Sequence, residues 1–520
     1  MPQHRLAALL AGRVPILVLL ALITLLIAAL APRSYQDIDE RLSDALWRLT
    51  PEAAQERRII IVDIDEASLS RHGPWPWPRE RLATLIERLH QAGANLLLID
   101  ILLPQPQAGD AHLRQALDTL PTVLAQAFDL QGRTAPPLAE GQLSGALRHP
   151  RCPPTFPTAQ GYLGLSPALA DHPAGHITPH IDPDGAVRRL PALICHGQQT
   201  YPALTLAALI AASHAPPELE LTPGHTLLDP AYWLEGPGLQ GFRLPLDERG
   251  NLRIAYRKPR EAFLAISAAD LLDQRTPAHL LQGAWVLLGG TAFGLGDAVP
   301  TPYGGAVGGV EVHAQLLSAL LDGHLPYTPQ GAGILQTSLA LIGALTLLAL
   351  TRLRGTISVF ILPLAGLTLA LGILLIHTAA LLSHNLWIGP SAPASYLILS
   401  GLALGIHQHA RTRRERERLY ANLASYLPQD VAAELAQHAP SNVIEAHRAN
   451  ITALVADIRN YSAYCEGRTP EEAAALLHAF FTLAVRIIEQ HGGVVENFIG
   501  DAILALWPAP QTPERQAERA

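Results

Sequence analysis

The sequence predicts a membrane protein built from an α/β domain, four transmembrane helices and a partial α+β domain of ferredoxin-like βαββ order. Apolar residues make up 49% of the 520 residues and charged residues 16%, and the mean hydropathy is +0.19. This composition is too apolar for an ordinary soluble protein. Four uncharged runs interrupt the chain, and the segments after the first and the fourth run carry strand and helix patterns.

The uncharged runs cover residues 14–32, 331–351, 356–382 and 387–406. At about 1.5 Å per helical residue, about 20 residues cross a hydrocarbon core of about 30 Å, so each run is long enough to span a bilayer. The first run is longer than the apolar part of a signal peptide and has no evident small-residue cleavage site. We therefore expect a retained anchor there.

Basic residues in the short flanks predict the orientation. Arg5 and Arg13 precede the first span, Arg352 and Arg354 lie between the second and third, and five arginines follow the fourth within residues 411–418. Because such residues stay in the cytoplasm, residues 1–13 and the tail are expected inside and residues 33–330 outside. The Ala, Leu and Arg bias of the chain indicates a bacterium, so we expect a multi-pass protein of the inner (plasma) membrane.

Charge and residue usage exclude several classes of function. A net charge of −8 and a pI of about 6.3 argue against nucleic-acid binding. Lys258 is the sole lysine, and its surroundings do not form a phosphate-binding loop of the Walker type. The three cysteines indicate neither a zinc site nor a disulfide framework; Cys152 and Cys195 could pair after export, which is the less favoured alternative.

The segment after the first span has a mixed α/β pattern. Strands are expected at 58–64, 95–103 and 284–289, the last returning to the same sheet, and helices at 78–90 and 310–323. Acidic side chains follow several of these strands and could line a ligand pocket at the strand ends. Capping of turns and helices is the favoured alternative for them. They are Asp63, Asp65, Asp100 and Asp297.

Four motifs in this segment resemble the CHASE type 2 extracellular sensory domain. They read VDIDEASL from Val62, GPWPWPR from Gly73, DPDGAVRRLP from Asp182, and LLGGTAFGLGDAVPTPYG through GVEVHAQLL over 287–317. The resemblance implies a periplasmic or extracellular sensor domain over 33–330, with one helix before it and usually three after it. It implies an extracytoplasmic ligand but does not identify one.

The cytoplasmic tail begins with residues 411–440, which alternate in charge and then place leucines four residues apart. They predict a signalling helix that pairs with a second copy, and a solvated juxtamembrane helix is an equal alternative. A partial domain at 445–520 follows. Its pattern is a strand at 450–456 ending at Asp457, a helix starting at the Thr469-Pro470-Glu471-Glu472 capping sequence, and strands at 494–498 and 502–507.

This strand order would bring Asp457 close to Asp501, which lies in the turn of the hairpin, although 44 residues separate them. Two carboxylates in oxygen-only surroundings suit two Mg²⁺ or Mn²⁺ ions, which keep water ligands and bridge substrate phosphates. One ion would activate a ribose hydroxyl and the other would hold a polyphosphate. Structural turn aspartates are an equal alternative on spacing alone.

Two motifs here, ADIRNYS from Ala456 and VENFIGDAILALW from Val495, resemble the metal-binding segments of class III adenylate and guanylate cyclases. The resemblance implies that ATP is converted to cyclic AMP and pyrophosphate by attack of the ribose 3′-hydroxyl on the α phosphate, in a homodimer. It makes Asp457 and Asp501 catalytic metal ligands. Ile458 would bind metal through its carbonyl, and the following amides would bind phosphate, at Arg459, Asn460, Tyr461 and Ser462.

Two departures from the cyclase pattern affect these expectations. Asn497 stands where adenylate cyclases usually carry lysine and guanylate cyclases glutamate, so GTP is an alternative substrate. The sequence also ends at Ala520, roughly seventy residues into a domain that runs more than twice as far in the family. We therefore expect this chain alone to be inactive. The alternative is a non-catalytic sensor or dimerisation subunit with a cyclase remnant.

Overall fold

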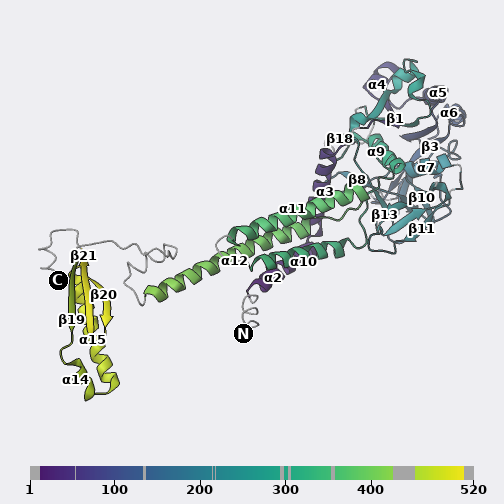
Figure 1. Ribbon diagram of the computed structural model, residues 1–520. Helices are drawn as coiled ribbons and strands as arrows, with labels where there is room; N and C mark the ends of the chain where they lie inside the picture. Colours follow the sequence, from purple (N-terminus) through teal and green to yellow (C-terminus); the bar gives the residue numbers. More distant parts are fainter. Residues whose placement is uncertain are drawn as a thin grey trace. The chain divides into compact units, whose positions relative to one another are not determined.

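The computed structural model describes residues 12–52, 54–132, 136–213, 215–216, 218–239, 241–292, 295, 298–302, 306–352, 358–424 and 451–508. The chain forms two compact units, residues 1–405 and 406–520, which are described separately. The first holds the α/β domain and the apolar helices (Figure 1). The second begins within a long helix and holds the C-terminal strands.

An eight-stranded sheet forms the centre of the α/β domain, in the order β15-β1-β16-β2-β3-β5-β4 with β6 also paired to β3. The pairs of β1 with β15 and β16, of β2 with β16 and β3, and of β3 with β6 are parallel. The strands are β1 (Glu56–Ile64), β2 (Leu96–Leu102), β3 (Thr122–Asp129), β4 (Ala139–Glu140), β5 (Gly161–Leu163), β6 (Ala174–His176), β15 (Phe263–Ser267) and β16 (Trp285–Gly290).

Helices cover both faces of this sheet, which explains why its strands are continuous apolar runs. Leu97 and Ile99 point into a cluster with α5 and α6, whereas Leu96 and Leu98 point into a cluster with α7 and α9. The helices of the domain are α4 (Glu66–His72), α5 (Arg79–Gln91), α6 (Asp110–Leu117), α7 (Leu204–Ser213), α8 (Ala268–Leu272) and α9 (Gly309–Asp322), with short 3-10 turns η1 (Pro237–Leu239), η2 (Arg260–Ala262) and η3 (Ala278–Leu280).

The expected strands and helices of this domain are present, and the returning strand β16 lies between β1 and β2. Because β16 lies between them, β1 and β2, which the chain connects through α5, are not neighbours in the sheet. Small sheets complete the domain: β9 with β10, β11-β12-β13, β14-β8-β7 and β17 with β18. Their bounds are β7 (His180–Ile181), β8 (Val187–Pro191), β9 (Leu193–His196), β10 (Gln199–Pro202), β11 (Glu220–Pro223), β12 (Tyr232–Glu235), β13 (Leu244–Leu246), β14 (Asn251–Arg253), β17 (Ala298–Pro300) and β18 (Ala306–Gly308).

A disulfide links Cys152 to Cys195. The expectation that no disulfide framework is present is therefore wrong, and the less favoured pairing is the one that the structure contains. Forty-three residues separate the two cysteines in sequence, and the strand β9 brings Cys195 back to the loop that carries Cys152. Spacing alone could not reveal this contact. Cys465 is a free thiol.

Among the described residues, three helices are long and apolar enough to cross a membrane: α2 (Arg13–Leu30), α10 (Ala332–Leu350) and α11 (Ser358–His384). The fourth expected span, residues 387–406, overlaps the first half of α12 (Ser391–Ala424), which is not one of these three helices and runs beside α11 (Figure 1). These two helices approach so closely at Gly366 that a Cβ atom added to this glycine would lie 2.6 Å from the Leu397 carbonyl oxygen. The helix α3 (Pro32–Leu49), which the sequence analysis did not predict, follows α2 directly, with Pro32 in its first turn.

The second unit contains β19 (Ile451–Asp457), α14 (Tyr461–Glu466), α15 (Pro470–Gln490), β20 (Val494–Ile499) and β21 (Ala502–Pro508). The three strands form an antiparallel sheet in the order β19-β21-β20, as the βαββ pattern predicts. Thr469 caps α15 in the expected capping box with Glu472. The expected signalling helix is helical over 411–424 within α12, and residues 425–440 lie outside the described part of the chain.

Candidate functional site

The sheet of the second unit has one covered and one uncovered face. Ile503, Ala505 and Trp507 alternate along β21 and pack under α15. The residues between them on β21, which point to the other face, are more exposed. Exposure along β19 alternates in the same way, and the strand ends with the exposed Asp457. Because neighbouring residues of a strand point to opposite faces, Asp457 belongs to the uncovered face.

The strand register brings the two predicted metal-binding acids together. Asp457 pairs directly with Ala502, the residue that follows Asp501, and Gly500 completes the tight turn with a φ of 66°. The 44-residue separation is thus closed by the sheet. Asp457 is exposed and Asp501 half-buried, so neither lies sealed in the core.

Asn497 also lies on the uncovered face. It pairs with Leu504, which pairs on its other side with Val455, so these residues form one row across the sheet. Asp457, Ala502 and Ile499 form the next row. A register shift between Val495 and Asn497 sets this position, because the extra residue turns Asn497 to the face opposite α15. The predicted base-reading residue and metal-binding acid are therefore one row apart.

The predicted phosphate-binding segment forms the turn between β19 and α14. Asn460 adopts a left-handed conformation with a φ of 58° and begins the helix. The amide of Tyr461 donates to the Ile458 carbonyl at 3.3 Å, so this amide is already engaged and one lone pair of the carbonyl remains. Tyr461 Oη donates to the Ala473 carbonyl of α15 at 3.0 Å. Its side chain therefore anchors α14, and Arg459 and Ser462 are exposed.

Within the described residues, no group of three or more His, Cys, Asp and Glu side chains forms a metal cage. The candidate centre is instead made of two acidic residues whose backbones the sheet brings together, Asp457 and Asp501, and of the turn residue Ile458 that follows Asp457. Such a donor set fits Mg²⁺ or Mn²⁺, which bind through few protein oxygens and retain water. The residues that could hold the ions are Asp457, Asp501 and Ile458.

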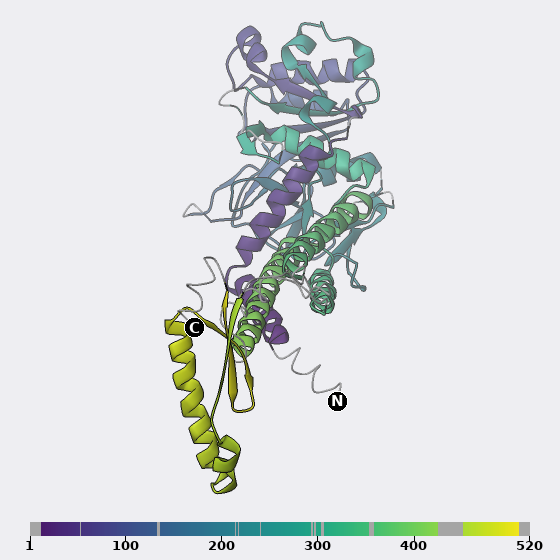
Figure 2. The same cartoon turned by 60° about the vertical axis from the view of Figure 1, so that its left-hand side comes forward.

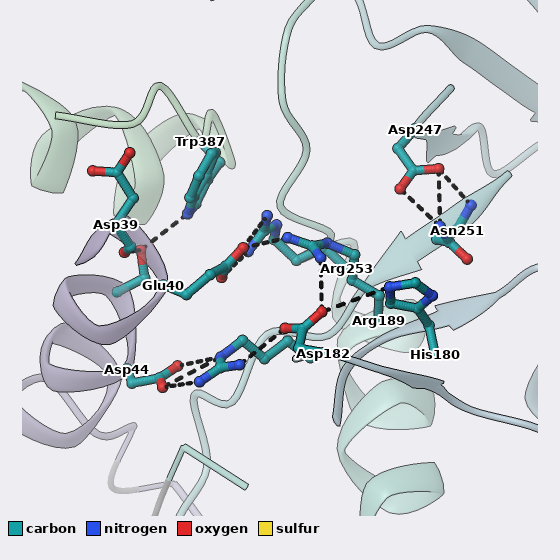
Figure 3. A network of polar contacts seen from close by, with 12 residues as sticks. Asp39, Glu40, Asp44, His180, Asp182, Arg189, Asp247, Asn251, Arg253 and Trp387 are labelled. Atoms are coloured by element: carbon teal, nitrogen blue, oxygen red, sulfur yellow. Dashed lines mark hydrogen bonds and ion pairs between the residues drawn. The ribbon is translucent and has the colours of Figure 1, made fainter. Parts of the chain in front are cut away.

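The first unit contains a buried ion network where α3 meets the α/β domain (Figure 3). Glu40 of α3 pairs with Arg189 of β8 and, at 2.6 Å, with Arg253 of β14. Asp44, one turn further along α3, pairs with Arg188 at 2.8 Å. Burial alone would raise the pKa of Glu40, but Arg253 and Arg189 outweigh it and lower that pKa. Glu40 is therefore held ionised inside the protein.

The same helix also contacts the loop between α11 and α12. Trp387 Nε1 donates to Ser43 Oγ at 2.9 Å, and the Ser391 amide donates to Asp39 Oδ1 at 2.8 Å. The Arg253 guanidinium lies 4.3 Å from the centre of a Trp387 ring. Figure 3 shows Glu40, Arg253 and Trp387 gathered at this point. One side of α3 thus joins the α/β domain to the start of α12.

This network was not predicted, although part of its signal was visible. The sequence DPDGAVRRLP supplies Asp182, Asp184, Arg188 and Arg189, and Arg188 binds both aspartates of this motif. What the sequence does not reveal is that Glu40 and Asp44 of a distant helix complete it. Their neighbours in sequence are polar and resemble an exposed surface helix.

The strand-end aspartates of the α/β domain have different roles. Asp65 caps α4 by accepting from the Ser68 amide at 2.8 Å, as the favoured capping alternative predicts. Asp63 accepts from the Thr291 amide at 2.9 Å and ties the end of β1 to the loop after β16. Asp100 lines a cavity. Asp297 lies outside the described residues.

Together, these features define a membrane-anchored protein whose α/β domain is inserted between apolar helices and followed by a small βαββ unit. The match to a family model agrees with this class. The CHASE2 domain model matches residues 17–351, which is more than half of the chain, and the protein belongs to this family of sensor domains.

Curated relatives match the chain over shorter stretches. Adenylate cyclase 1 of Rhizobium meliloti is 32% identical over 107 residues, which are 21% of this chain and 16% of that protein. Soluble guanylate cyclase gcy-31 of Caenorhabditis elegans is 34% identical over 109 residues, 21% of this chain and 15% of the relative. An uncharacterized protein of Mycobacterium tuberculosis, Rv1320c, is 30% identical over 112 residues, 22% and 19% of the two chains. The chain thus spans less than a fifth of these relatives.

Proposed function

We propose that this protein is a membrane-bound, receptor-type adenylate cyclase of the bacterial inner membrane. In this proposal four helices span the membrane, the CHASE2 domain lies outside, and the βαββ unit lies in the cytoplasm and converts ATP to cyclic AMP and pyrophosphate. Similarity to an adenylate and a guanylate cyclase supports the reaction class. GTP remains the alternative substrate, since an asparagine side chain can both donate and accept.

The observation that carries the proposal is the pairing of Asp457 with Ala502, next to Asp501, on an uncovered sheet face. Two carboxylates that share one site repel each other unless a cation lies between them. Bound Mg²⁺ or Mn²⁺ would lower the pKa of the ribose hydroxyl and neutralise charge on the leaving pyrophosphate. The two carboxylates would orient the nucleotide through these ions, and Asn497 of the partner subunit would contact the purine, because class III cyclases take the metal-binding acids of a site from one chain and its purine-reading residues from the other.

The uncovered face also supports association with a second copy. Ile451, Val455 and Ile499 on this face are 49%, 66% and 58% exposed. Apolar side chains concentrated on one sheet face are favourable to bury. A homodimer that covers this face would also bring residues of the partner subunit close to Asp457.

The test uses membranes from cells that express the protein from its complete reading frame. Cyclic AMP and cyclic GMP formation are measured with Mg²⁺ or Mn²⁺ and with EDTA. We expect metal-dependent activity that falls at least a hundredfold in Asp457→Asn and in Asp501→Asn, because each variant removes a charge that binds metal. Glu489→Gln, an exposed change on α15, is the matched control and should retain activity.

Undiminished activity in either aspartate variant would refute the assigned metal roles. Complete absence of metal-dependent activity in the unaltered protein would favour the second candidate, a non-catalytic sensor subunit that dimerises through the uncovered face. Crosslinking of cysteines introduced at Val455 would then still occur between copies.

A further inference from the structure

A cavity of about 910 Å³ lies inside the α/β domain. It is bordered by the carboxyl ends of three neighbouring parallel strands, at Ile64 of β1, Leu102 of β2 and Gly290 of β16, and by the first turns of α9. Open α/β sheets bind ligands at this edge, and the volume is typical of small-molecule sites. The cavity therefore has the position and the size of a binding site.

The walls of the cavity are mostly aliphatic. Ile101, Ile177, Val187, Leu190 and Val312 line it, together with Trp75. Such a lining favours a ligand with an apolar body, because each buried methylene group contributes about 0.8 kcal/mol. Charged molecules without an apolar part would find few partners here.

Two polar side chains, Asp100 and His313, interrupt this apolar lining. His313 is 3% exposed, and its Nδ1 has no hydrogen-bond partner among the residues that the structure describes. Asp100 and His313 are therefore the polar side chains that a ligand in this cavity would meet. A ligand that covers them without a hydrogen-bonding group of its own would bury their polar atoms unpaired, which is costly.

The surroundings select the charge of that group. A Cβ on Gly309 would lie 3.5 Å from Asp100 Oδ2, so the Asp100 carboxyl lies at the N-terminal end of α9. The helix dipole disfavours a cation there, and the Asp100 carboxyl disfavours an anion. A neutral group that both donates and accepts a hydrogen bond matches a carboxyl and an imidazole together.

Burial favours the uncharged form of both side chains. It raises the pKa of Asp100 and lowers the pKa of His313, although each group opposes the shift of the other. Burial also lowers the pKa of the adjacent His176 to about 3, so no imidazolium charge is expected beside the cavity. A neutral ligand adds no charge to a site where burial already disfavours charge.

We propose that this cavity is the ligand site of the CHASE2 domain and that it takes a neutral, largely aliphatic molecule whose hydroxyl group lies between Asp100 and His313. The hydroxyl donates to one side chain and accepts from the other, while the aliphatic part fills the cavity. This assignment rests on the proposed sensory role of the domain. Binding is nevertheless measured without cyclic nucleotide formation, so a failure of the cyclase proposal is recognised separately.

The experiment titrates 1-octanol, octanoate and octylammonium into the full chain in lipid nanodiscs, with empty nanodiscs subtracted, by isothermal titration calorimetry. The three probes share a chain length and differ only in the polar group. We expect saturable binding of one 1-octanol per chain and binding of both ionic probes that is at least tenfold weaker. Stronger binding of an ionic probe, or no saturable octanol binding above that of empty nanodiscs, overturns the proposal.

Variants assign the site. Asp100→Leu and His313→Leu remove one hydrogen-bonding group each and should weaken octanol binding at least tenfold, whereas Asp100→Asn should bind within threefold of the unaltered protein. Ile181→Trp places a large side chain at a half-exposed position of the lining and should block binding while leaving the polar pair intact. The control Asp118→Asn, on the surface, should bind normally. Unchanged binding in both Leu variants, or in Ile181→Trp, refutes the site.

Discussion

Asp39 is a buried acid whose partner is a backbone amide. Its Oδ1 accepts a hydrogen bond from the Ser391 amide at the start of α12, and Asp39 as a whole residue is 5% exposed. Burial raises its pKa to about 6, and the hydrogen bonds from Ser391 only partly oppose this. A carboxyl that is protonated more readily in the folded state makes stability depend on pH.

The direction of this dependence follows from the two pKa values. Between pH 3.8, where the unfolded Asp39 ionises, and about pH 6, the folded state holds more protons, so the free energy of unfolding falls as the pH rises. The loss is about 3 kcal/mol at most, at about 1.4 kcal/mol per pKa unit. In Asp39→Asn this dependence disappears, while the amide oxygen still accepts from Ser391.

Heat unfolding of the detergent-solubilised protein, followed by circular dichroism, measures this prediction. The melting temperature of Asp39→Asn minus that of the unaltered protein should increase from pH 4 to pH 6 and stay constant above pH 7. Asp171→Asn, an exposed change, should give a constant difference. A difference for Asp39→Asn that does not change with pH contradicts the assigned pKa.

Individual residues were predictable where local pattern determines their place. Asp457 ends a strand and Asp501 lies in a hairpin turn, so an antiparallel register sufficed to bring their backbones together. Asp39 and Glu40 offered no such pattern, because their partners Ser391 and Arg253 are more than 200 residues away. Long-range burial of charge depends on tertiary packing, which short-range spacing does not encode.

Among the elements, α15 shows how a local signal determines a boundary. Thr469 Oγ1 accepts from the Glu472 amide at 3.4 Å, and Glu472 Oε2 accepts from the Thr469 amide at 3.2 Å. Pro470 in the first turn needs no hydrogen-bond donor there. The helix start was therefore predicted to the residue.

Removing this cap should loosen the start of α15 selectively. Replacing a capping Thr with Ala costs about 1 kcal/mol, which corresponds to roughly fivefold faster amide exchange in the first turn. Hydrogen exchange of the full protein in nanodiscs, read by mass spectrometry on peptides covering 469–478, measures Thr469→Ala against Thr469→Ser. Thr482→Ala, whose hydroxyl bonds only to the His478 carbonyl of the same helix, is the control. Equal exchange in all three variants would show that the cap does not stabilise this helix.

Other elements were predicted in kind but not in arrangement. The strands β1, β2 and β16 are apolar runs buried on both faces, which makes them recognisable. Their order in the sheet depends on which strand packs between which helices, and β16 enters from almost 200 residues away. The helix α3 was missed because its inward-facing side carries Asp39, Glu40, Ser43 and Asp44 in place of an apolar stripe.

In the first unit as a whole, a hydrophobic cluster of the α/β domain extends to the end of α11 and the loop that follows it, while the apolar helices pack together in a cluster of their own. Trp47 of α3, Leu381 of α11 and Trp387 belong to the same hydrophobic cluster as Leu316 and Leu320 of α9. In Figure 2, α3 (purple) extends along this junction. Because α9 also borders the cavity, a ligand that moves α9 would act on a cluster that reaches the end of α11.

The disulfide predicts the side of the membrane on which this domain lies. Disulfides persist in oxidising compartments and are rare in the bacterial cytoplasm. If residues 33–330 are exported, as the arginine distribution predicts, Cys152 and Cys195 should be oxidised in cells and Cys465 should be reduced. Acid-quenched cells, denatured and treated with polyethylene-glycol maleimide, should give one modified cysteine before reduction and three after it.

The variant Cys465→Ser should then give none before reduction and two after it, which assigns the free thiol. Epitope tags inserted near Pro216 and near Ser441 test the orientation independently of thiol chemistry. Protease added to spheroplasts should remove the first tag and leave the second. Three modified cysteines before reduction, or protection of the Pro216 tag, would place the CHASE2 domain in the cytoplasm. The cavity at α9 would then have to bind a cytoplasmic ligand. The proposal of an external sensor domain would fail, whereas the proposal of a ligand site in the cavity would stand.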